Sequence, residues 1–232
     1  PDLDRAACVA DLKRFLAEAR DLRLVAAENA VHGQRRLRLR AWQAARLART
    51  HADLLASPRF GIAAAFFLTD LYGPKDFSER DAEVERILPI MTTMLPVSGL
   101  RTLLLAVEVD ALSERFDAQM VAVLGKRLDQ EDLTTDAYAS AYRKVGDRPG
   151  RELQIRLIGE TGDALDALSR KSFVRGALKM MHGPANMAGL GELHAFLLRG
   201  FEAFRSMREA DEFLGTIIQR ERDVLKELFL EA

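Results

Sequence analysis

Apolar residues recur every three or four positions along almost the whole chain. No segment shows the alternation of apolar and polar residues that a half-buried strand requires. The helical period is clearest over residues 100–128 and 214–228. Because an apolar helix face must be covered by another element, these helices have to pack on one another. The sequence therefore predicts an all-α fold: one compact, bundle-like domain over residues 1–232, with about eight to ten helices.

Prolines and glycines divide the first half of this pattern into segments. We expect a first helix over 3–20 and one long helix over 22–55, weakened at Gly33 and ended by Pro58. Residues 60–72 are apolar almost all round, which is typical of a helix buried at the centre of a fold. The next helix is expected to begin at residue 77 and to kink or end at Pro89.

Capping residues predict the helices of the second half. Thr135, Asn186 and Asp211 are each expected to cap a helix that follows, and the segment Asp147-Arg-Pro-Gly is expected to open another helix. The helix after Asp147 is predicted to run to residue 181, with a break at Gly159 or Gly162.

The charge balance excludes several classes of protein. With 34 basic and 35 acidic side chains the net charge is −1, so no overall charge attracts the chain to nucleic acid or to an anionic membrane. The longest strongly apolar run, residues 60–68, is far shorter than the roughly 20 residues of a membrane span. One cysteine, Cys8, excludes an internal disulfide framework. With no visible signal peptide and no run long enough for a membrane span, we expect a cytoplasmic protein with no membrane partner. The excess of arginine over lysine and the abundance of Ala and Leu lead us to expect a bacterial origin.

Motifs that carry known chemistry are missing from the sequence. It has no GxxxxGK[ST], GxGxxG, HExxH or GxSxG segment. A di-iron bundle needs Glu-x-x-His on two helices, but Glu28 and His32 are four residues apart, and Glu192 and His194 are two apart. We therefore expect no metal, no cofactor and no identifiable catalytic residue.

The stretch FFLTDLYGPKDFSERD, residues 66–81, is the first candidate site. Asp70 follows an apolar run at a helix C-terminus, where a carboxylate is unfavourable unless it has hydrogen-bond donors. Backbone N–H groups near Asp76, or the side chain of Arg80, can supply them if the chain reverses at Gly73. The stretch is then mainly a helix corner. The alternative is a ligand site formed by Asp70, Tyr72 and Arg80.

Glu108 is a second candidate ligand residue. It lies four residues after Leu104 and four before Leu112, so the three side chains share a helix face. A carboxylate against the core would be a ligand-binding or proton-handling group in an interior pocket with Asp70 and Tyr72. The simpler interpretation is a partly exposed residue paired with an arginine.

A basic stretch provides the third candidate. Six arginines, with Trp42 among them, lie between residues 35 and 49 with no acid between them. Arg38 and Arg40 are the candidate anion-binding residues for nucleic acid or another polyanion. The near-zero net charge favours a solvated face whose arginines pair with acids of neighbouring helices, so nucleic acid is not the favoured partner.

The segment MMHGPANMAGLGELHAF, residues 180–196, is rich in glycine and alanine. Small residues allow close approach of helices, which is the favoured interpretation. An anion at a new helix N-terminus is the alternative.

Two segments resemble those of a known group of proteins. The stretch FFLTDLYGPKDFSERD, and with it MMHGPANMAGLGELHAFLLRGFEAFRSM, resembles a signature of an uncharacterised family of bacterial all-helical proteins. The resemblance covers the chain from about Leu22 onward. It implies a helical fold and a protein of unknown function, with no catalytic residues to assign.

These observations favour a non-catalytic binding or regulatory protein that holds a protein partner or a small ligand. One alternative is an enzyme or cofactor carrier with a pocket near Asp70, Tyr72 and Glu108. Another is a nucleic-acid binder that uses the basic stretch. A homodimer also remains open.

Overall fold

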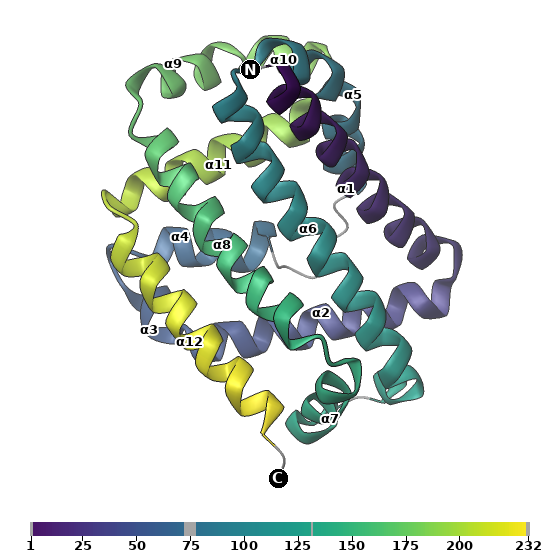
Figure 1. Ribbon diagram of the computed structural model, residues 1–232. Helices are drawn as coiled ribbons and strands as arrows, with labels where there is room; N and C mark the ends of the chain where they lie inside the picture. The colour runs from purple at the N-terminus through teal and green to yellow at the C-terminus, as the bar shows by residue number, and fades with distance from the viewer. Residues whose placement is uncertain (1, 72–77, 131, 231–232) are drawn as a thin grey trace.

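The computed structural model describes residues 2–71, 78–130 and 132–230, and all regular structure in these ranges is helical (Figure 1). This confirms the predicted all-α fold. In chain order the elements are α1 Asp2–Glu28, α2 Ala30–Thr50, α3 Ala52–Ala56, α4 Gly61–Phe66, the π-helical turn η1 Phe67–Leu71, α5 Ser78–Met94, α6 Val97–Leu124, the 3-10 helix η2 Gly125–Asp129, α7 Thr135–Val145, α8 Arg148–Ser169, α9 Ser172–Met180, α10 His182–Met187, α11 Gly191–Met207 and α12 Asp211–Phe229. None of these helices is long and apolar enough to cross a membrane.

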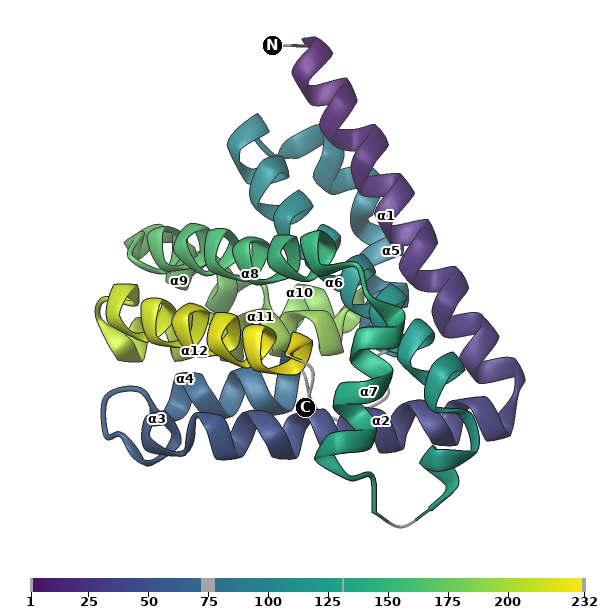
Figure 2. The same cartoon turned by 60° about the horizontal axis from the view of Figure 1, so that its bottom comes forward.

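Helix α6 runs through the middle of the molecule and organises the fold. Helices α1 and α8 pack along it, and α2 and α7 cover its C-terminal half (Figure 1). Helix α12 packs on α8, and the segment from α2 to α4 lies on the other side of α12 (Figure 2). Each long helix therefore has at least one apolar face covered, as the helical period requires.

Four clusters of buried side chains form the core. The largest joins α3, α4, α11 and α12 and includes Phe66, Phe204 and Phe213. A second joins α2, α6, α7 and α12, and the other two hold α6 against α1 and α8. Helices α9 and α10 add little to these clusters, since α9 has no buried side chain and Ala185 is the buried residue of α10.

Several predicted boundaries in the first half are wrong. The first helix continues past residue 20 and ends before Asn29, whose side chain accepts a hydrogen bond from the backbone N–H of His32 and caps α2. The expected helix over 22–55 is also broken at His51, and α5 continues through Pro89. The segment after Phe60 is not buried all round, because Ile62 is 63% exposed.

In the second half, the corrections concern the residues that cap the helices. Helix α8 opens where predicted, with Asp147 as its cap, but Thr134 rather than Thr135 caps α7. Asn186 lies inside α10, and Asp211 lies in the first turn of α12 after Ala210.

Helix α8 has no break at Gly159 or Gly162. These glycines instead let α12 come close, since a Cβ on Gly162 would lie 2.5 Å from Leu214 and one on Gly159 would lie 2.6 Å from Ile218.

Candidate functional site

Asp70 lies in the π-helical turn η1 and is held by α11. Arg199 donates from Nε and Nη2 to Asp70 Oδ1, at 3.0 and 2.7 Å, and the hydroxyl of Thr69 donates to Oδ2 at 3.0 Å. Arg80 of α5 donates to the backbone carbonyl of Asp70 at 3.2 Å and stacks over the ring of Phe196. The structure thus brings Asp70 and Arg80 together, with Arg199 as the partner that the sequence reasoning missed.

The remaining residues of this candidate are only partly described. Tyr72 and Asp76, and with them the predicted chain reversal at Gly73, lie outside the described residues. Glu108 lies on α6 among different neighbours: Arg14, Asp11, Glu160 and Arg156 act on its charge. Burial raises the pKa of Glu108, and the side chain is only partly buried. Neither the hydrogen bonds and ion pair of Asp70 nor the charges that act on Glu108 join these two residues in the described part of the chain.

The basic stretch forms α2, and four of its six arginines pair with acids as expected: Arg35, Arg36, Arg40 and Arg46. The pairs of the last three are not solvated, however. Arg36, Arg40 and Arg46 have side chains 14–21% exposed, and each bonds a carboxylate on α6 or α12. Arg38 donates to the backbone carbonyl of Leu128 at 2.8 Å. The prediction of a solvated face is wrong for Arg36, Arg40 and Arg46, because the acids that they meet point inward, whereas Arg38 is exposed.

Glu114 is the centre of this internal network. Its side chain is 2% exposed and accepts hydrogen bonds from Arg23, Arg36 and Arg40. Arg23 also binds Asp110 through Nη2 at 2.6 and 2.7 Å. Arg40 donates from Nε to Asp117 at 3.0 Å. Three guanidinium groups from α1 and α2 are therefore fixed against three carboxylates of α6.

The charges of this network perturb one another. Burial acts to raise the pKa of Glu114, but Arg40, Arg23 and Arg36 outweigh it and hold the pKa below its usual value. Burial and the charge of Arg40 lower the pKa of Arg36. The sequence contained a signal for Glu114: it follows Val107 by seven residues and Ala111 by three, so it lies on the buried face of α6.

A second internal network joins α2 and α12. Arg46 donates from Nη1 to both carboxylate oxygens of Glu221 at 2.7 Å, and His51 Nε2 lies 3.0 Å from Glu221 Oε1. Nearby, the guanidinium of Arg151 lies between the rings of Phe116 and Tyr142, 3.7 and 4.2 Å from their centroids. Its Nε and Nη2 are buried without a hydrogen-bond partner.

These networks are better suited to holding helices together than to catalysis. A general acid or base must be free to exchange a proton with a substrate, whereas Glu114 and Glu221 are engaged by two or three cationic or histidine partners each. No group of three or more His, Cys, Asp or Glu side chains in the described part of the chain could hold a metal ion.

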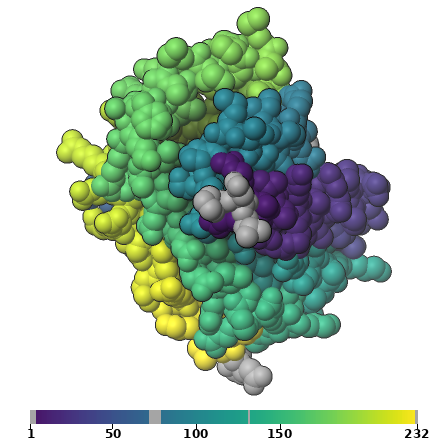
Figure 3. Space-filling model, turned by 45° about the horizontal axis from the view of Figure 1, so that its top comes forward, coloured from purple at the N-terminus to yellow at the C-terminus, as the bar shows by residue number. Residues whose placement is uncertain are grey.

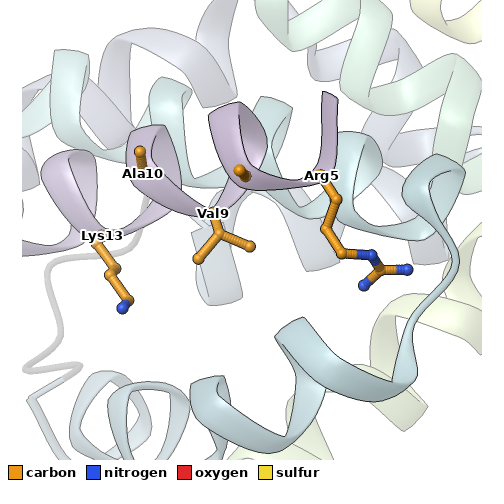
Figure 4. A pocket seen from close by; sticks show the side chains of 5 residues that line it. Arg5, Val9, Ala10 and Lys13 are labelled. Atoms are coloured by element: carbon orange, nitrogen blue, oxygen red, sulfur yellow. The ribbon is translucent and has the colours of Figure 1, made fainter. Parts of the chain in front are cut away.

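A hollow on α1 contains none of the candidates. It is lined by Arg5, Ala6, Val9, Ala10 and Lys13 (Figure 4). Arg5 reaches across to the backbone carbonyls of Thr92 and Leu95 at the end of α5, at 2.7 and 2.9 Å. The hollow is wide open, and Arg5 already uses its donors to join α1 to α5, so it offers little to enclose a small ligand.

The most unusual surface lies on α9 and α10, at the upper rim of the view in Figure 3. Phe173, Met180, Met181 and Met187 are 70, 80, 50 and 90% exposed, and we call these four residues the α9–α10 surface. Val174 and Leu178 are partly buried against the protein, and the other residues of α9 are exposed. Phe173, Ala177 and Met180 follow the i, i+4, i+7 spacing of one helix face, so α9 presents an uncovered apolar ridge.

The sequence reasoning interpreted part of this segment as a close-packed region, which is wrong at Gly183. A Cβ on Gly183 or on Gly176 would meet nothing within 4 Å. Gly189 has φ +67°, so it serves the turn between α10 and α11 rather than helix packing. The amphipathic spacing of residues 173–181 was the available signal, and the expectation of one helix from 147 to 181 obscured it.

Comparison with known proteins identifies a protein family that matches most of the chain. A family model described as "Domain of unknown function (DUF8198)" matches residues 23–232. None of the curated proteins and none of the solved structures matches the chain. The matched range includes the α9–α10 surface, both internal networks and the Asp70 cluster.

Proposed function

We propose that this chain, which belongs to the DUF8198 family, is a non-catalytic binding module that docks a partner protein on its α9–α10 surface. The observation that carries the proposal is α9 itself. It is a nine-residue amphipathic helix with no buried side chain, and it exposes Phe173 and Met180 on one face.

Covering this surface with a partner would be favourable, because it removes apolar side chains from water. Each apolar side chain of this size gains about 1.5–3 kcal/mol when it is fully removed from water. Phe173, Met180 and Met187 are at least 70% exposed and together offer several kcal/mol to a partner. Methionine suits such a role because its flexible, polarizable side chain adapts to different apolar surfaces.

The interior supports the same proposal indirectly. The acids and arginines of the two networks neutralise each other, and no free pair of catalytic groups remains in them. The single cysteine, Cys8, is buried and free, which fits a reducing compartment. We accordingly propose a cytoplasmic bacterial protein, with the arginine-rich composition as further support.

Photo-crosslinking in the native cells tests the proposal. A photoreactive phenylalanine analogue replaces Phe173 or Met187 in two variants, and it replaces Glu227, an exposed residue of α12, in the control. We expect both α9–α10 variants to give an adduct with the same defined protein and the Glu227 variant to give none. The Met180→Ser change should weaken the adduct without altering the melting temperature, since Met180 is 80% exposed. Absence of adducts, or the same adducts from all three positions, would contradict the proposal.

A further inference from the structure

The polar side of α9 is strongly and uniformly basic. Arg170, Lys171, Arg175 and Lys179 lie in a run of 25 residues, 167–191, that contains no aspartate or glutamate. Arg170 is paired with Asp166. Lys171, Arg175 and Lys179 are all exposed, and within the described part of the chain they have no ion pair and no side-chain hydrogen bond.

Many other cations of the molecule are paired. Elsewhere arginines commonly meet a carboxylate or a backbone carbonyl, as Arg35, Arg59 and Arg220 do at the surface. Three neighbouring cations on one short helix therefore have their charge uncompensated next to an uncovered apolar ridge.

The geometry of α9 puts the two features within reach of one partner. At 100° per residue, Phe173 and Met180 lie on one flank of the helix, and Arg175 and Lys179 lie on the other. Val174 and Leu178 face the protein, so Gly176 lies on the outermost line between the two flanks. The open space over Gly176 allows a second backbone to cross there and to contact both flanks.

We infer that the partner segment is an acidic amphipathic helix, which lays an apolar face on Phe173 and Met180 and carboxylates toward Lys171, Arg175 and Lys179. This inference rests on the proposed function and specifies its partner. A helix is the fitting shape because an i, i+4, i+7 ridge packs into the groove of another helix. Among the described residues no strand edge exists to which an extended peptide could add.

Two model peptides test the charge requirement on the intact protein. Both are helical peptides of about 18 residues, or five turns, with leucines along one face. One carries glutamate at its polar positions, and the other carries lysine. We expect the glutamate peptide to bind at least about tenfold more tightly near 50 mM salt, because opposite charges attract at that ionic strength. Its affinity should fall about tenfold toward 500 mM salt as the charges are screened.

Matched variants assign the effect to α9. The triple change Lys171→Glu, Arg175→Glu and Lys179→Glu should reverse the preference. The same change at Lys126, Lys144 and Arg222, which are exposed on other elements, should leave it unaltered. Phe173→Ser should weaken the binding of both peptides.

The outcomes separate this inference from the proposed function. Equal binding of the two peptides, with both lost in Phe173→Ser, would overturn the acidic partner and leave apolar docking intact. Binding of neither peptide would overturn the inference, and the crosslinked protein would then be examined for the segment that docks. Tighter binding to phosphatidylglycerol vesicles than to the glutamate peptide would assign the surface to membranes instead. A dimer that Phe173→Ser dissociates would assign it to a second copy of the chain.

Discussion

Glu114 illustrates how strongly one residue can depend on its partners. Its carboxylate is 2% exposed and bonds three guanidinium groups. Glu114→Gln keeps the shape but removes the charge, so Arg36 would lose its carboxylate partner, while Arg23 and Arg40 would keep their pairs with Asp110 and Asp117. We expect a loss of about 3–5 kcal/mol in the free energy of unfolding, measured by urea denaturation. Glu108→Gln on the same helix is the control and should change stability by less than about 0.5 kcal/mol, since Glu108 makes no ion pair.

Arg151 is a buried charge that, unlike Glu114, contacts aromatic rings rather than groups of opposite charge. Two of its nitrogens are buried without partners, and only the faces of Phe116 and Tyr142 offset its charge. A desolvated contact between a cation and a ring contributes up to about 2 kcal/mol, while each unpaired buried donor costs about 1–3 kcal/mol. Arg151→Met should therefore leave stability unchanged or raise it by up to about 2 kcal/mol in thermal or urea unfolding. A loss above about 2 kcal/mol would show that the ring contacts dominate.

Asp70 is a weaker structural link than either. Arg199 is 49% exposed, so solvent screens its pair with Asp70, which is itself 13% exposed. Asp70→Asn should cost about 1 kcal/mol, and a double-mutant cycle with Arg199→Gln should assign that loss to the pair. A raised melting temperature for Asp70→Asn would instead indicate a functional acid held at a cost in stability.

At the level of elements, capping and packing residues explain which predictions from sequence succeeded. A helix was predicted to open at Asp147-Arg-Pro-Gly, and the side chain of Asp147 does accept a hydrogen bond from the N–H of Gly150 there. Asn29 could have been predicted on the same grounds, but apolar periodicity continues across it and hides the break. The period of apolar residues identifies the apolar face of a helix but does not show whether another element covers it. The exposure of α9 could therefore not be deduced before α8, α10 and α11 were placed.

Glycine-to-alanine changes in α8 and α12 should have opposite effects on stability if these helices pack closely. Gly215 lies in α12 with open space where a Cβ would stand, whereas a Cβ on Gly162 would lie 2.5 Å from the buried Leu214. Gly215→Ala should stabilise the protein by about 0.5–1 kcal/mol, because alanine favours the helix. Gly162→Ala should destabilise it by about 1–3 kcal/mol through overpacking. The same change of sign should appear in melting temperatures, and two shifts in the same direction would contradict the close α8–α12 packing.

Considered as a whole, the molecule pairs its charges both inside and at the surface. The two networks link α1, α2 and α6 through Glu114, and α2 and α12 through Glu221. The cations of α9 are left at the surface. A nearly neutral chain thus combines internal ion pairs with a basic surface on α9, which is why net charge alone could not reveal the candidate binding surface.

The internal carboxylates predict how the stability of the whole domain depends on pH. Despite burial, Arg40, Arg23 and Arg36 hold the pKa of Glu114 below its usual value, and His51 and Arg46 do the same for Glu221. A depressed pKa in the folded state stabilises the protein above the unfolded pKa of about 4.3, and this contribution is lost as pH falls through the folded value. Burial raises the pKa of Asp81, Glu108 and Asp163, so protonation of these groups favours the folded state.

The two effects act in different pH ranges and can be separated. As pH falls from 7, the free energy of unfolding should first hold or rise slightly as the groups with raised pKa take up protons. Below about pH 4 it should fall steeply, as Glu114 and Glu221 are protonated. Urea unfolding from pH 7 to pH 3 measures this curve, and Glu114→Gln supplies the comparison. Its deficit relative to the wild type should shrink toward pH 3, because protonation of Glu114 removes the same charge as the substitution. A deficit that stays constant down to pH 3 would mean that the charge of Glu114 is not what holds α1 and α2 against α6.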